Sequence, residues 1–113
     1  MPVTLIKENE KLSIEIDGST FYYRRIRDVD FANIRRKHTK RGEVDNMAVG
    51  LEVLENYVVG WDGVTDPDGN EVPFSRELIA DLPSVIQVQL LNRINADTTG
   101  VNVTKKLKTT PTP

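Results

Sequence analysis

The sequence predicts an α+β fold, with an N-terminal β-hairpin or small antiparallel sheet followed by a mainly helical domain of about four helices and a flexible C-terminal tail. Two patterns carry this prediction. Apolar and polar residues alternate over residues 12–16, which is the period of a half-buried strand. Further along, apolar residues recur at three- and four-residue spacing, the period of an amphipathic helix. The length of 113 residues suits one compact domain, which we expect over residues 1–98, with a disordered polar tail over 99–113.

The first expected element is a hairpin centred on Asp17 and Gly18. Both residue types tolerate the positive φ angles of a tight hairpin turn. The return strand would cover residues 20–26, and residues 3–7 could add a third strand. Such a sheet needs a helix to cover its apolar face.

Two segments in the middle of the chain carry helix signals. Asp30 is placed to cap a helix that runs to about His38, and Gly42 is expected to end it. A longer helix is predicted from about Asp45 to Trp61, because apolar residues recur there at helical spacing. The stripe expected to form the core consists of Val44, Met47, Leu51, Leu54, Val58 and Trp61.

A second apolar set lies on another side of this long helix. Val49, Val53 and Tyr57 stand four residues apart, so either the helix is sandwiched within the domain or this set reaches a partner. We assign this set to a partner-binding surface. Trp61 is assigned to the same surface, as a core residue whose edge is exposed. On this assignment, Val53→Asp or Tyr57→Asp would leave the fold intact and abolish partner binding.

Two further helices are expected in the last third of the chain. Ser75 is a suitable N-cap for a short helix. Pro83 suits the first turn of the next helix, because its missing N–H would have no partner there. That helix would end by Thr98 and would carry one apolar face made of Ile86, Leu90, Leu91 and Ile94.

Charge is divided unevenly along the chain. Between residues 24 and 41 eight cations face two carboxylates, whereas between residues 43 and 81 ten carboxylates face one arginine. Opposite patches can dock head-to-tail between subunits, which predicts self-association that weakens as salt rises. The basic run could instead follow a phosphate backbone, or both runs could be solvated helix faces. The basic residues that we assign to partner binding are Arg35, Arg36, Lys37, Lys40 and Arg41.

No catalytic, cofactor or metal site is predicted, and we expect a non-enzymatic protein. The absence of cysteine excludes disulfides and thiolate metal sites. The lone His38 has cations on both sides and no nearby acid in sequence, which indicates an exposed polar residue. The acidic run at residues 66–69 fails as a calcium loop, because Val64 and Ser75 would occupy positions that need carboxylates. The usual phosphate-binding and hydrolase motifs are missing.

The most distinctive pattern of the chain lies in its middle. It consists of Trp61-Asp62-Gly63-Val64, Asp66-Pro67-Asp68-Gly69, Val72-Pro73-Phe74-Ser75 and Leu82-Pro83. This pattern resembles the tail assembly chaperone family of long-tailed, siphovirus-like bacteriophages or prophages, and the resemblance covers roughly residues 22–94. It implies an assembly factor in the host bacterial cytoplasm that binds the tape-measure protein, helps recruit tail-tube protein and is absent from the mature virion.

Two other classes stay open. A structural virion component, such as a tail completion or connector protein, could share the N-terminal hairpin and would be retained in particles. A small nucleic-acid-binding regulator would use the basic run with Tyr22 and Tyr23, but only Asn33 offers a polar base reader there, so we do not expect nucleic acid as the partner. A homo-oligomer is compatible with the opposite charges. No membrane partner is expected, since no window holds the eighteen or so apolar residues of a membrane span.

Overall fold

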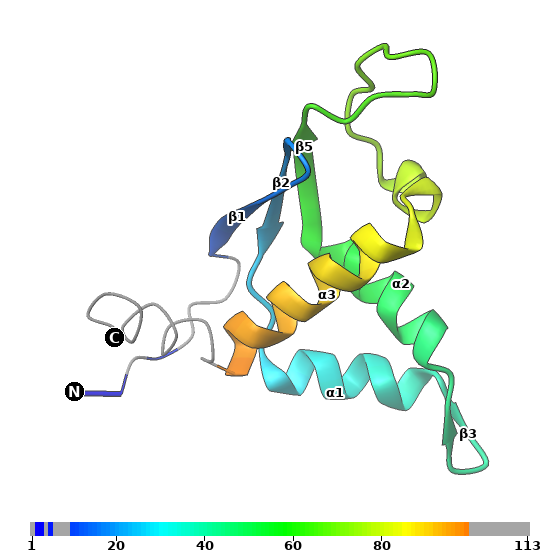
Figure 1. Ribbon diagram of the computed structural model, residues 1–113. Helices are drawn as coiled ribbons and strands as arrows, with labels where there is room; N and C mark the ends of the chain where they lie inside the picture. The colour runs from blue at the N-terminus through cyan, green and yellow to red at the C-terminus, as the bar shows by residue number, and fades with distance from the viewer. Residues whose placement is uncertain (1, 4, 6–9, 100–113) are drawn as a thin grey trace.

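The computed structural model describes residues 2–3, 5 and 10–99. The elements along the chain are β1 (Lys11–Ile16), β2 (Ser19–Arg24), α1 (Asp28–Lys37), β3 (Thr39–Lys40), β4 (Glu43–Val44), α2 (Asn46–Tyr57), β5 (Val58–Asp62), the 3₁₀ helix η1 (Arg76–Asp81) and α3 (Ser84–Thr99). Figure 1 shows the sheet of β1, β2 and β5 beside the helices. The predicted α+β class, with its N-terminal antiparallel sheet and four helices, is confirmed.

The N-terminal hairpin forms where the sequence predicts it. β1 and β2 pair antiparallel, and Asp17 and Gly18 have φ angles of +51° and +84°, as a two-residue turn of this hand requires. The sheet order is β1-β2-β5, so its third strand is β5. Of residues 3–7, which were expected to supply that strand, only residues 3 and 5 are described, and neither lies in a strand.

The long helix expected to reach Trp61 is shorter. Asp45 caps α2 by accepting a hydrogen bond from the amide of Ala48 at 3.1 Å, but the helix ends at Tyr57. The next residues form β5, which pairs antiparallel with β2. The sequence Val58-Val59-Gly60 has poor helix propensity, and pairing with β2 satisfies its backbone groups. Trp61 is therefore a strand residue and not the last residue of a helix.

Of the three residues expected at helix starts, Asp30, Ser75 and Pro83, only Pro83 has the expected role. Arg27, not Asp30, is the N-cap residue of α1, and its guanidinium bonds the Asp30 carboxylate at 3.0 Å. This bond lowers the pKa of Asp30. Ser75 holds the N-cap position of η1, but its hydroxyl donates to the carboxylate of Glu77 instead of to a backbone amide. The carbonyl of Pro83 accepts the first helical bonds of α3, so the predicted start of that helix is confirmed.

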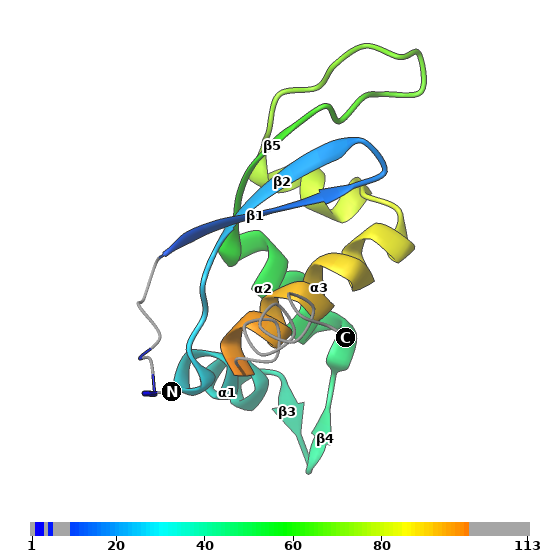
Figure 2. The same cartoon turned by 60° about the vertical axis from the view of Figure 1, so that its left-hand side comes forward.

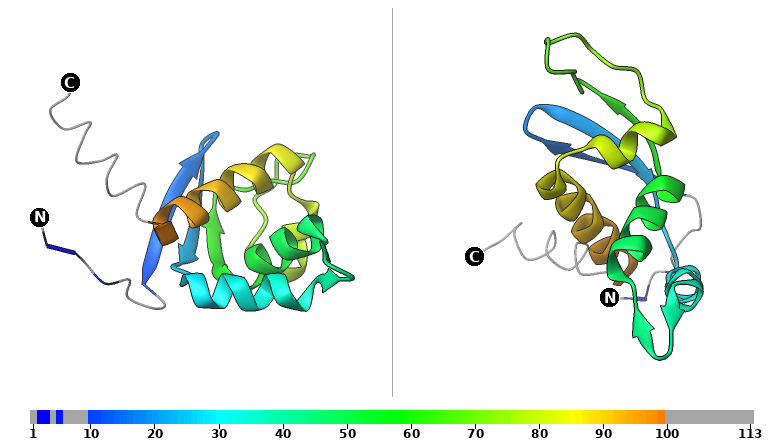
Figure 3. Two further views of the ribbon diagram at one scale, coloured as in Figure 1. Left: turned by 90° about the horizontal axis from the view of Figure 1, so that it is seen from below. Right: turned by 90° about the vertical axis from the view of Figure 1, so that its right-hand side faces the viewer.

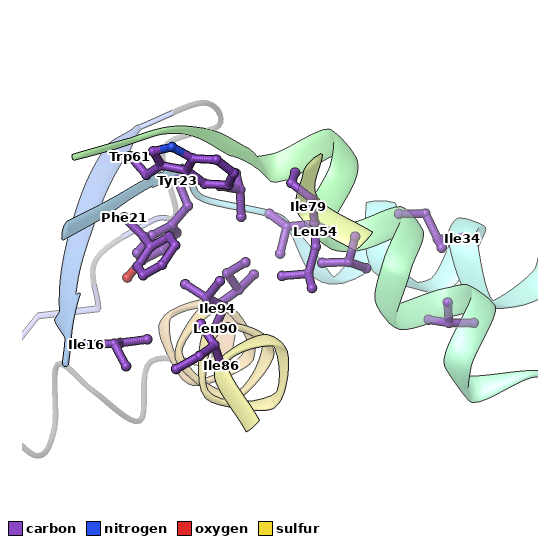
Figure 4. Packing of buried hydrophobic residues seen from close by; sticks show 14 residues of the cluster. Ile16, Phe21, Tyr23, Ile34, Leu54, Trp61, Ile79, Ile86, Leu90 and Ile94 are labelled. Carbon is purple, nitrogen blue, oxygen red and sulfur yellow. The ribbon is translucent and has the colours of Figure 1, made fainter. Parts of the chain in front are cut away.

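The core lies between one face of the sheet and the helices, which Figure 2 shows on a single side of the sheet. Phe21 and Tyr23 of β2 extend from the sheet towards α3, whose residues Ile86, Leu90 and Ile94 are buried (Figure 4). The predicted apolar face of the last helix is thus confirmed. The described part of α3 runs to Thr99, and the remainder of the expected tail, residues 100–113, lies outside the described residues.

A buried polar contact joins the end of α3 to the sheet. Asp97 is only 7% exposed and accepts a hydrogen bond from the hydroxyl of Tyr23. The guanidinium of Arg25 donates to the backbone carbonyl of Asp97 at 3.1 Å. Burial, followed by the bond to Asp97, raises the pKa of Tyr23. Since a buried carboxylate without donors is costly, these bonds hold the last turns of α3 against β2.

Candidate functional site

An open groove, here called the helix groove, lies between α1, α2 and α3. Its volume is about 210 Å³. Phe31 of α1 forms one wall, Leu91 and Ile94 of α3 form another, and Val49 and Val53 of α2 form its floor. Three helices therefore supply one apolar concave surface.

The edge of the helix groove carries neutral amides. Asn46 of α2 and Asn92 and Asn95 of α3 are among its lining residues, none of which is charged. Gly50 of α2 also lines the groove, and a Cβ atom there would lie 2.9 Å from the Cδ1 atom of Leu91. The glycine thus permits the close approach of α2 and α3. An apolar floor with amide edges can bury apolar side chains without desolvating a charge.

The two valines assigned from sequence to a partner surface belong to the core. Val49 and Val53 are 5% and 1% exposed, so their assignment to an exposed surface is wrong, and so is the expectation that Val53→Asp leaves the fold intact. The reason is that α1, α3, η1 and β5 all pack against α2. The stripe expected to be core is largely confirmed, since Leu54, Val58 and Trp61 are buried and Val44 and Leu51 pack against the core. Its exception is Met47, which is 87% exposed near the start of α2.

Tyr57 and Trp61 lie away from the helix groove. The guanidinium of Arg24 stacks 4.3 Å above the ring of Tyr57 and donates to the carbonyl of Asn56 at 2.8 Å. Trp61 is 7% exposed, and its Nε1 donates to the carbonyl of Val72 at 2.8 Å. The prediction that Trp61 is mainly core is confirmed. Tyr57 and Trp61 therefore do not extend the apolar surface that Val49 and Val53 contribute to the helix groove.

The basic candidate residues gather at one end of the molecule. Arg35, Arg36 and Lys37 form the last turn of α1, and Lys40 and Arg41 stand at the tip of the β3–β4 hairpin. Gly42, expected to end α1, instead completes the turn of this hairpin with a φ of +80°. Lys40 and Arg41 are exposed and make no side-chain bond with the rest of the described chain.

His38 has an acidic partner that the sequence did not reveal. Its Nε2 lies 2.6 Å from one carboxylate oxygen of Glu52, and the Nζ of Lys37 lies 2.7 Å from the other. The interpretation of His38 as an exposed polar residue is therefore wrong, because the residue is partly buried and paired with Glu52. Glu52 comes 14 residues later in the chain, and only the hairpin between α1 and α2 brings it back. The hydrogen bonds from Lys37 and then His38 lower the pKa of Glu52 below its usual 4.5.

We expect Glu52→Gln to destabilise the protein by about 1 kcal/mol near neutral pH. A carboxyl whose pKa is lowered by folding stabilises the fold above the unfolded pKa, here 4.5, and this contribution is lost as pH falls through the folded value. The difference from the native protein in urea unfolding should therefore shrink when the pH is lowered from 7 to 3. Glu55→Gln on the same helix is the control. A Glu52→Gln deficit that is equal at both pH values would contradict this account.

The distinctive central motif builds a loop after β5. Trp61 bonds Val72 across the base of this loop, and Thr65 forms an isolated bridge with Glu71. The carboxylate of Asp66 accepts hydrogen bonds from the amides of Asp68 and Asn70, which makes Asp66 a turn-forming residue. Within the described residues no three His, Cys, Asp or Glu side chains are placed to hold a metal ion.

A second concave surface, here called the loop pocket, lies between this loop and η1. Its volume is about 260 Å³. Trp61, Leu78 and Leu82 give it apolar walls, and Asp66 and Asp81 also line it. Phe74 packs edge-on against the ring of Trp61, with 5.0 Å between the centroids. Residues from both ends of the central motif thus meet around Trp61.

Comparison with known proteins yields one family. The family model described as YdaY prophage protein matches residues 20–109 of this chain. The match begins in β2 and includes every residue of the helix groove and of the loop pocket. Neither a curated protein nor a solved structure matches the chain. Among the described helices, none is both long and apolar enough to cross a membrane.

Proposed function

Because the chain belongs to the YdaY prophage protein family, we propose that it is a non-enzymatic tail assembly chaperone that binds the tape-measure protein. In this role it works in the cytoplasm of the host bacterium, covers apolar helical segments of its partner and helps recruit tail-tube subunits. It is absent from the mature virion. The family supports a prophage origin, and the resemblance of the motif between Trp61 and Pro83 to tail assembly chaperones supports the role in tail assembly.

The helix groove is the observation that carries this proposal. A partner helix presents apolar side chains at three- and four-residue spacing, and a groove between helices is a common receptor for such a stripe. The groove volume of about 210 Å³ lies below the roughly 300–1,000 Å³ of small-molecule pockets. The size and the uncharged lining favour a few protein side chains as the ligand.

The exposed side of α3 extends this surface beyond the groove. Val85 and Val88 are 62% and 53% exposed. They are followed along the same side by Gln89, Asn92 and Asn95, all exposed and all uncharged. A helix lying along α3 would therefore meet apolar and amide side chains without having to desolvate charges, which favours displaceable binding to an apolar partner.

The test is to tag the chain in its prophage host, identify the proteins that co-purify by mass spectrometry, and analyse purified virions. We expect the tape-measure protein in the eluate and no tagged chain in the virions. Asn92→Glu places a charge at the edge of the helix groove and should reduce recovery of the tape-measure protein at least tenfold, or about 1.4 kcal/mol. Asn70→Glu makes the same exchange on the loop after β5 and should leave recovery unchanged.

The outcomes separate the candidate functions. Retention of the chain in virions would make it a structural tail component and overturn the chaperone proposal. Failure to recover any tape-measure protein would overturn it as well. Equal recovery with Asn92→Glu and with the native chain would remove the helix groove as the binding site.

A further inference from the structure

The β3–β4 hairpin carries two cations away from the body of the molecule. Its strands contain two residues each and pair Thr39 with Val44 and Lys40 with Glu43. Only Val44 of the hairpin packs against the core. A hairpin this short adds little stability of its own. Neither strand pairing nor packing on the core therefore gives the projecting hairpin a structural role.

Arg41 holds a backbone conformation that disfavours arginine. Its φ is +54°, and Gly42 follows with +80°. Asn, Asp and Gly are the residues favoured at such turn positions. In the N-terminal hairpin of this chain, the same two positions hold Asp17 and Gly18. The second hairpin thus keeps a long cationic side chain where the turn favours a short one, and such a conformation is typical of residues retained for function.

The opposite end of the molecule is acidic. Figures 1 and 3 show the loop after β5 and the β3–β4 hairpin at opposite ends. Arg76 is the single cation between residues 62 and 81, against six carboxylates. These are Asp62, Asp66, Asp68, Glu71, Glu77 and Asp81.

The loop pocket has the chemistry to receive a long cationic side chain. The aliphatic stem of arginine or lysine packs on apolar walls while its charged head pairs with a carboxylate. Trp61, Leu78 and Leu82 supply the walls. Asp66 already accepts two backbone amides. Asp81 is exposed and makes no side-chain bond within the described residues, so it is the acceptor.

We propose that the hairpin tip of one copy, carrying Lys40 and Arg41, docks in the loop pocket of a second copy, where Asp81 accepts the cation. A chain cannot fill its own pocket, because the β3–β4 hairpin lies at the opposite end of the molecule from the loop after β5 (Figure 2), which lines the pocket. The contact is heterologous, since it joins two different surfaces of the chain. After two copies bind, the first still has a free pocket and the second still has a free hairpin. Such contacts build rings or filaments. This assembly does not depend on the proposed role in tail assembly.

The test is self-association of the full-length chain by sedimentation velocity. The native chain should form oligomers whose apparent Kd rises at least tenfold between about 0.05 and 0.5 M NaCl, because exposed charge pairs are screened. Arg41→Gly keeps a residue suited to the turn and should be monomeric with an unchanged unfolding midpoint. Asn33→Gly on α1 serves as a control for loss of a side chain elsewhere and should still associate.

A charge exchange tests the pairing itself. Arg41→Asp and Asp81→Arg should each be monomeric alone, because the first sets a carboxylate opposite Asp81 and the second sets a guanidinium opposite Arg41. Mixed together, they should assemble, since each hairpin again meets a pocket of opposite charge. A native chain that is monomeric at every salt concentration would overturn the proposal, as would mixed variants that fail to assemble. Binding of a DNA duplex that Arg41→Asp abolishes, without self-association, would instead assign the hairpin to nucleic acid.

Discussion

Val53→Asp is expected to prevent stable folding. Val53 is 1% exposed, and the floor of the helix groove around it offers only apolar or neutral side chains. A buried charge without a partner costs about 3–5 kcal/mol, while a domain of this kind has a total stability of roughly 5–15 kcal/mol. Urea unfolding followed by circular dichroism should therefore show a midpoint near zero denaturant or no cooperative transition.

Met47→Asp is the matched control for this variant. It lies on the same helix and is 87% exposed. An aspartate in the first turn of a helix also interacts favourably with the helix dipole, so its midpoint should equal or slightly exceed that of the native protein. A stable Val53→Asp variant would contradict the burial of Val53, and a Met47→Asp variant that unfolds would contradict the exposure of Met47.

Trp61→Ala is expected to cost about 3–5 kcal/mol of stability. The indole is 7% exposed and lies edge-on to Phe21 and to Phe74, with centroid separations of 6.2 and 5.0 Å. Its removal opens a cavity between the sheet and the loop, and leaves the carbonyl of Val72 without its donor. Urea unfolding by circular dichroism measures the loss.

Trp61→Phe separates the two contributions of the indole. It keeps an aromatic ring against Phe21 and Phe74 but removes the hydrogen bond to Val72, so its cost should be clearly smaller than that of alanine. Because Trp61 is the sole tryptophan, the native protein should also show emission typical of a buried indole, shifting to the red on unfolding. Native emission typical of water, or a cost of Trp61→Ala below about 1 kcal/mol, would contradict the burial of this residue.

Elements governed by local signals were predictable from the sequence. The turn at Asp17 and Gly18 needs positive φ at both positions, a property of the residue types themselves. The buried face of α3 follows from the spacing of Ile86, Leu90 and Ile94. These signals hold because they depend on neighbours within one turn of the chain.

The end of α2 was not predictable in this way. Val58 and Trp61 stand at a spacing that also continues a helical stripe, so the period alone could not distinguish strand from helix. The free edge of β2 accepts the backbone of β5, and this pairing is a property of the assembled sheet. The same holds for the site, where periodicity identified Val49 and Val53 as an apolar set but not which side of the helix other elements would cover.

The sequence by itself therefore determined the fold class, the N-terminal hairpin, the last helix and the separation of basic from acidic residues, because composition and local spacing carry that information. Only the tertiary structure decided that Val49 and Val53 of α2 are buried along with Leu54, that Glu52 meets His38, and that the β3–β4 hairpin and the loop after β5 lie at opposite ends. Those features depend on contacts between segments far apart in the chain, and such contacts form only when the helices pack on the sheet.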